Sequence, residues 1–188
     1  MLARLSLLIL VIFMLPNVSN ALIVSGGLGL GSTSMKNEAK ETEGPFTETF
    51  TVEKLFHSKL AMGVEHLRSL TPKLISSASF TGLLARFYVN AAPVSIVPPE
   101  EMGADTMITH DYCVFYGTGV GNAQSSRLPN DQDLSSNSAG IYVSPRAGVD
   151  YQLSRHVGVR GEFIYATTVF GKGNITLMTL GGSIYWMF

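Results

Sequence analysis

Four histidines and one cysteine are the side chains of this sequence that most often bind metals or act in nucleophilic chemistry. The histidines are scattered along the chain, at His57, His66, His110 and His156. None is placed relative to another with the spacing of a zinc-binding motif, and Cys113 has no second cysteine with which to form an intramolecular disulfide. We therefore expect no metal site, no cofactor and no disulfide.

The glycine-rich segment GGLGLGST, residues 26–33, is a second candidate for chemistry, because glycine loops can bind phosphates. It lacks the G-x-G-x-x-G spacing, and no Gly-Lys-Ser/Thr follows it. The formal net charge of −1 also provides no general attraction for nucleic acid. We therefore exclude nucleotide binding and nucleic-acid partners.

Seven charged side chains are left as candidates for a functional site, because they fall on the polar faces of alternating segments. They are Lys59, Glu65, Arg86, Arg146, Asp150, Arg160 and Glu162. If the apolar faces point toward lipid, these charges face inward. The set would then line a pore or an active site, or form a salt-bridged plug. We favour the plug, because unpaired buried charges are costly.

The segments that carry these charges show the period-two alternation of β-strands. In residues 138–152, for example, Val143 and Val149 share one face, and Arg146 and Asp150 share the other. The alternating runs are longer than the common soluble strand of about 5–6 residues. They are long enough for a tilted membrane strand, which needs about 9–11 residues. Charged residues make up only 14% of the chain, against about 25% in a typical soluble domain.

The N-terminal segment, MLARLSLLILVIFMLPNVSNA, has the features of a secretory signal peptide. Arg4 precedes an apolar run that ends before Pro16, and this run is too short for a membrane-spanning helix. Small residues precede a predicted cleavage after Ala21. We expect a signal peptide over 1–21 and a single mature domain over 22–188. With no other long apolar run, a membrane-spanning mature domain would have to be a barrel.

The mature sequence contains eight alternating segments, at 22–33, 45–53, 57–68, 76–90, 110–123, 138–152, 156–168 and 175–188. An even number of strands suits a closed barrel in which the N- and C-termini of the chain both lie in the periplasm. The polar segments 34–44, 124–137 and 169–174 would then lie outside the cell, and 153–156 would be a periplasmic turn. The predicted fold is all-β, an eight-stranded antiparallel up-and-down transmembrane β-barrel.

Two segments leave the assignment open. Apolar residues between 52 and 68 also recur at helical spacing, so periodicity alone permits a helix there. We favour strands, because the even strand count fails without them. The connection 91–109 is long for a periplasmic turn, and the sequence gives no reason for its length.

These features resemble the small outer-membrane β-barrel family of Gram-negative bacteria, which includes the OmpA-type and the OmpX/Ail-type barrels. The resemblance rests on YGTGVGNAQSS, on the hairpin SPRAGVDYQLSRHVGVRGEFIYA and on the ending GSIYWMF. It implies a place in the bacterial outer membrane, in contact with outer-membrane lipid. It also implies that the barrel-assembly machinery reads an assembly signal here formed by Ile184, Trp186 and Phe188.

Three functions fit such a barrel. The first is a non-enzymatic role in envelope structure or surface interaction, with a ligand bound by the outer loops 34–44 and 124–137. The second is a small porin-like channel for ions or small solutes. The third is a lipid-modifying enzyme, but the barrel deacylases carry His-x-Ser on the strand before the last. The corresponding segment here, VRGEFIYAT, contains neither residue. We therefore expect no enzymatic activity.

Overall fold

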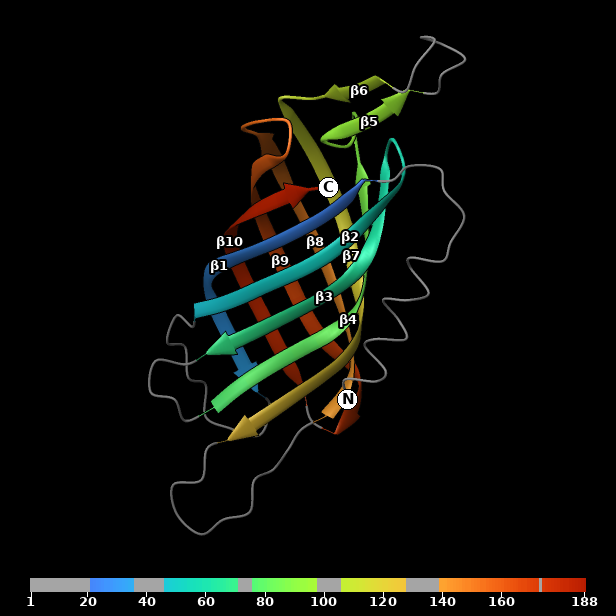
Figure 1. The fold of residues 1–188 in the computed structure, drawn as a ribbon. Coiled ribbons are helices and arrows are strands. Elements are labelled where there is room, and N and C mark those ends of the chain that lie inside the picture. Colours follow the sequence, from blue (N-terminus) through green and yellow to red (C-terminus); the bar gives the residue numbers. More distant parts are fainter. Residues whose placement is uncertain (1–20, 36–45, 71–75, 98–105, 128–138, 173) are drawn as a thin grey trace.

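Alternating apolar and polar residues form eight long antiparallel strands, which close into a barrel in the computed structural model (Figure 1). The structure describes residues 21–35, 46–70, 76–97, 106–127, 139–172 and 174–188. The barrel strands are β1 (Leu22–Met35), β2 (Phe46–His57), β3 (Leu60–Leu70), β4 (Ser76–Tyr88), β7 (Tyr112–Arg127), β8 (Ala139–Gln152), β9 (Val157–Lys172) and β10 (Ile175–Met187). The first and last strands, β1 and β10, pair with each other, so the barrel has no open edge.

The strands are strongly staggered. The pairing register, followed once around the barrel from Val24, returns to β1 at Ser34, ten residues farther along. A stagger of this kind requires strands that tilt by about 35–45° from the barrel axis. Residues far apart in the sequence therefore meet at one level of the lumen.

Alternation along each strand separates an interior set of side chains from an exterior set. On β10, Ile175, Leu177 and Thr179 are buried, whereas Met178 and Leu180 are exposed. The exposed set is dominated by large apolar residues, among them Leu28, Phe50, Met62, Leu83, Val120, Val149, Phe163, Leu180 and Trp186. An apolar exterior around a polar interior is the arrangement of a transmembrane barrel. The described residues contain no helix that is long and apolar enough to cross a membrane.

The segment 52–68, in which the sequence left helix and strand open, forms strands. It contributes to β2 and β3, joined by the short turn at Ser58 and Lys59. The segments expected outside the barrel are shorter than predicted. Ser34 and Met35 belong to β1, residues 124–127 belong to β7, and residues 169–172 belong to β9. The rest of the first two segments lies outside the described residues. So does the predicted signal peptide apart from Ala21, and its cleavage stays a prediction.

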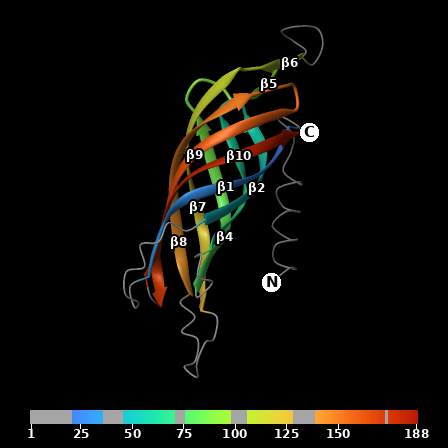
Figure 2. The ribbon, with the colours of Figure 1, turned by 90° about the vertical axis from the view of Figure 1, so that its left-hand side faces the viewer.

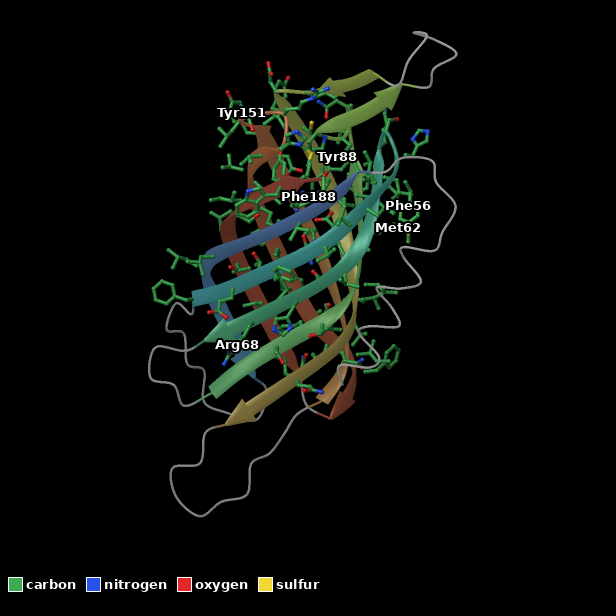
Figure 3. The ribbon with its side chains drawn as sticks, viewed as in Figure 1. Phe56, Met62, Arg68, Tyr88, Tyr151 and Phe188 are labelled. Atoms are coloured by element: carbon green, nitrogen blue, oxygen red, sulfur yellow. The ribbon has the colours of Figure 1, made fainter. Side chains whose placement is uncertain are left out.

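The connection 91–109 contains a second, two-stranded antiparallel sheet. Its strands are β5 (Val94–Val97) and β6 (Thr106–Thr109). Figures 1 and 2 show this hairpin beyond one end of the barrel, the end toward which Tyr151 and Phe188 also lie (Figure 3). We call it the turn end, because the short β2–β3 and β8–β9 turns lie there. The opposite end is the loop end.

Candidate functional site in the barrel interior

The structure brings six of the seven predicted charges into the lumen. Glu65, Arg86, Arg146, Asp150, Arg160 and Glu162 are all buried. Lys59 is not among them, which corrects the prediction that it faces inward. It lies exposed in the β2–β3 turn, where its Nζ donates to the carbonyl oxygen of Val89 at 3.3 Å. The expected strand at 57–68 begins only at Leu60, so the turn takes up the positions before it.

Glu53 is the interior residue that the sequence prediction missed. Its carboxylate is fully buried and forms a salt bridge with Nη1 of Arg86. It also accepts from Nη1 of Arg160 at 2.9 Å and from the hydroxyl of Thr51 at 2.7 Å. A signal for it is present, because Thr47, Thr49 and Thr51 form the buried face of β2 and Glu53 continues that face at the same two-residue spacing. Glu53 was the last residue of the expected strand 45–53, but it was not included among the inward charges.

Asp150 receives the most extensive set of interactions from a single arginine. Nε of Arg160 donates to Asp150 Oδ1 at 2.6 Å, and Nη2 donates to Oδ2 at 2.9 Å. Such a two-point pair is stronger and more directional than a single contact. The hydroxyl of Tyr88 donates to the same Oδ2 at 2.9 Å. Arg160 therefore joins Asp150 to Glu53 across the lumen.

Glu65 forms the other half of the network, nearer the loop end. It pairs with Nη2 of Arg146, and it accepts from the hydroxyl of Tyr142 at 2.9 Å and of Ser144 at 2.8 Å. Glu162 lies between the two halves. Its Oε2 is 3.3 Å from Nη2 of Arg86 and 3.7 Å from Nη1 of Arg146. We call these seven residues, Glu53, Glu65, Arg86, Arg146, Asp150, Arg160 and Glu162, the lumen cluster.

Aromatic rings lie beneath the guanidinium groups of the lumen cluster. The Phe115 ring centroid is 4.4 Å from Cζ of Arg86 and 5.3 Å from Cζ of Arg160. The ring of Tyr185 lies 5.4 Å from Cζ of Arg160. Cation–π contacts of this kind strengthen when the cation is desolvated. Salt bridges and the cation–π contacts of Arg86 and Arg160 thus hold the cluster together.

Charge in the lumen cluster is closely balanced, with three arginines and four carboxylates. Every carboxylate lies within salt-bridge distance of at least one arginine. Mutual pairing is what makes burial of so many charges tolerable. Within the described ranges, no group of three His, Cys, Asp or Glu side chains could hold a metal ion.

Apolar side chains fill the lumen on both sides of the lumen cluster. Toward the loop end, a buried apolar group is formed by Leu67, Ala78, Phe80, Ala123, Tyr142, Ile164, Ala166, Ile175 and Leu177. Toward the turn end lie two more, one of Ala21, Leu55, Ala61, Tyr88, Ala92, Cys113 and Phe115, and one of Ile23, Tyr185 and Met187. The charges are therefore flanked on both sides by buried apolar groups, beside which lie buried hydroxyl side chains such as Thr47, Thr49 and Ser69.

The histidines do not assemble into a site. His66 faces the exterior, and its Nδ1 lies 2.8 Å from the hydroxyl of Thr81. His156 lies in the β8–β9 turn, with Nδ1 3.2 Å from the carbonyl oxygen of Met187. Nδ1 of His57 lies 3.2 Å from the hydroxyl of its neighbour Ser58. The predicted assembly-signal residues Ile184, Trp186 and Phe188 all face outward at or near the turn end.

No family model matches this chain, and no curated protein matches it. Solved structures do match, at low identity and over nearly their whole length. Neisserial surface protein A (NspA) is 12% identical with a TM-score of 0.60, and the match covers 88% of this chain and 98% of NspA. The outer membrane protein OprG from Pseudomonas aeruginosa is 12% identical with a TM-score of 0.54, with 90% and 96% covered.

A third match is Ail, the attachment invasion locus protein of Yersinia pestis, solved in complex with the heparin analogue sucrose octasulfate. It is 11% identical with a TM-score of 0.53, and 89% of this chain and 98% of Ail are covered. At these identities the comparisons show the fold alone. The chain has the closed eight-stranded antiparallel fold of the small outer-membrane barrels, as its alternation predicted.

Proposed function

We propose that this chain is a protein of the bacterial outer membrane with a sealed lumen, which acts in envelope structure or surface interaction rather than as a channel or an enzyme. The observation that carries the proposal is the filled interior of the barrel, in which the lumen cluster lies between buried apolar groups. These groups flank the lumen cluster on both sides, and every carboxylate of the cluster is paired with an arginine within it. Hydrophobic constrictions block conduction by excluding water.

The loop end is the surface available to a ligand outside the cell. The sequence segments that join the strands there, 36–45, 71–75 and 128–138, hold five acidic residues and three lysines. The adjacent strand ends add Arg68, Arg127, Lys172 and Glu48, so positive and negative side chains are equal in number at the loop end. The charge of the loop end therefore does not select the kind of surface partner.

An enzymatic role is not supported by the residues of the barrel. The strand before the last, β9, has no histidine and no serine, so it lacks the pair that barrel deacylases use. The interior carboxylates are each engaged by arginine and are enclosed on both sides, away from any lipid substrate. A nucleophile and base must reach a substrate before they can act on it.

Conductance in planar bilayers tests the sealed lumen. We expect the purified protein to show no conductance steps, because the apolar groups at both ends exclude water from the path of an ion. As a control, a general diffusion porin reconstituted in the same bilayers should give steps. Reproducible steps from this protein at physiological salt would establish the channel alternative instead.

Replacing Leu180, which is 68% exposed, with arginine tests whether the exterior faces lipid. A charge on the lipid face near the bilayer midplane costs about 2–4 kcal/mol. We expect Leu180→Arg to lower the free energy of unfolding by that amount and to reduce the heat-modifiable form in outer-membrane fractions. Ser34→Arg, near the loop end of β1, is the matched control. Equal, small effects of both substitutions, or a soluble periplasmic product, would contradict the membrane placement.

A further inference from the structure

The hairpin β5–β6 is an addition that barrel closure does not need. The other two connections at the turn end consist of Ser58–Lys59 and of residues 153–156, whereas the β4–β7 connection runs from residue 89 to 111. Within it, Val94 pairs with Thr109, Ser95 with Ile108, Ile96 with Met107 and Val97 with Thr106. Neither strand of this sheet belongs to the barrel.

The base of the hairpin is fixed to the barrel by backbone hydrogen bonds. The amide of Ala92 donates to the carbonyl of Ser58 in the β2–β3 turn at 2.7 Å. The amide of His110 donates to the carbonyl of Pro93 at 3.1 Å and closes the base of the hairpin itself. The amide of Gln152 donates to the carbonyl of Asp111 at 2.8 Å. Ala92 and Pro93 are buried. The barrel therefore presents this hairpin in a set direction.

Among the described residues, β5 and β6 pair only with each other, so each has an edge without a strand partner. Natural proteins protect such edges with lysine, proline or a bulge. The eight residues of these two strands include no charged residue and no proline, and their register has no shift. A two-stranded hairpin is also only marginally stable unless something packs or pairs with it. These features favour addition of a further strand.

The direction of the free edge selects the kind of partner. In Figure 1 β5 lies between β6 and the barrel, so the outer edge of β6 faces away from the barrel end. In the proposed membrane placement this edge points into the periplasm. A second copy in the same bilayer would point its β6 edge in the same direction, so the two edges could not face each other. A partner must approach from the aqueous side.

We propose that the outer edge of β6, Thr106–Thr109, binds an extended segment of a periplasmic protein by strand addition. A sheet edge presents alternating amide and carbonyl groups, and the chemistry that matches it is another polypeptide backbone. The barrel would thereby anchor a soluble protein to the inner face of the outer membrane. This role goes beyond the loop-end interaction and does not depend on whether the lumen conducts.

Site-specific photo-crosslinking in intact cells tests the proposal. A photo-crosslinking amino acid is placed at position 107 on β6 or at position 96 on β5, which lie opposite each other in register and share a face. We expect a covalent adduct to a periplasmic protein from position 107, several-fold more than from position 96. Ile108→Lys should reduce the adduct several-fold, because a lysine protects an edge. Ser95→Lys, directly opposite on the inner strand, is the matched control and should preserve it.

Sequencing of the crosslinked peptide distinguishes the outcomes. The proposal requires an adduct to a periplasmic protein that depends on the β6 edge. It is overturned by adducts of equal yield from both positions, by an adduct to a second copy of this chain, by no adduct, or by one that Ile108→Lys leaves unchanged. Heat-modifiable migration of every variant shows whether the barrel has assembled. A failed interaction is thereby separated from a failure of the proposed membrane placement.

Discussion

Replacement of Arg160 by methionine should destabilise this barrel by about 3–5 kcal/mol, the range measured when one partner of a buried ion pair is removed. Among the described residues, Arg160 is the salt-bridge partner of Asp150, and it also contacts Glu53 and the rings of Phe115 and Tyr185. Methionine keeps much of the volume but removes the charge. Within the described part of the chain, Asp150 would then keep the hydroxyl of Tyr88 as its side-chain hydrogen-bond partner.

Urea unfolding in lipid vesicles, followed by the fluorescence of the single tryptophan, Trp186, measures this change. Lys59→Met removes a cation from the exposed turn and should change the free energy of unfolding by less than about 0.5 kcal/mol. The double variant Asp150→Asn with Arg160→Met should recover part of the loss, because it no longer buries an unpaired carboxylate. A loss below about 1 kcal/mol for Arg160→Met alone would mean that the lumen cluster is not structurally important.

The barrel itself could be predicted from the sequence because the pattern that specifies it, the alternation of apolar and polar residues, lies within each strand. In a membrane barrel the same two-residue alternation is repeated on every strand, so the inward face of each strand can be read without knowledge of its neighbours. Arg146 and Asp150 on β8, and Arg160 and Glu162 on β9, were placed inside for that reason. The closure of β1 on β10 followed from the even strand count.

The pairing inside the lumen was not predictable in the same way. Which arginine meets which carboxylate depends on the ten-residue stagger, and a single sequence does not reveal it. Glu53 on β2 contacts Arg160 on β9 through this stagger, although 107 positions separate them in the chain. Lys59 was misplaced because a shift of the turn by two or three residues moves a side chain from the strand into solvent. The hairpin β5–β6 was missed because its strands are short and lie between prolines and acidic residues.

Substitution of Gly119, a buried glycine of β7 beside the lumen cluster, should impair assembly because it adds atoms to a filled interior. A Cβ at this position on β7 would meet Oε1 of Glu65 and the hydroxyl of Ser144, the two groups that hold Arg146. The amide of Gly119 also donates to that hydroxyl at 3.1 Å. Overpacking a well-filled interior costs about 1–3 kcal/mol, and displacement of a buried ion pair adds to this cost. We expect Gly119→Val to abolish most of the heat-modifiable form.

Gly161→Val provides the matched comparison, because a Cβ on this exposed β9 glycine would meet no atom within 4 Å. Valine there should leave assembly unchanged or raise the free energy of unfolding by up to about 1 kcal/mol, since glycine is unfavourable inside a strand. Equal loss of assembly from both substitutions would show that these glycines are needed for backbone curvature. Loss from Gly119→Val alone would show that the interior glycine makes room for the carboxylate of Glu65, and thus that the sealed lumen depends on small residues beside its charges.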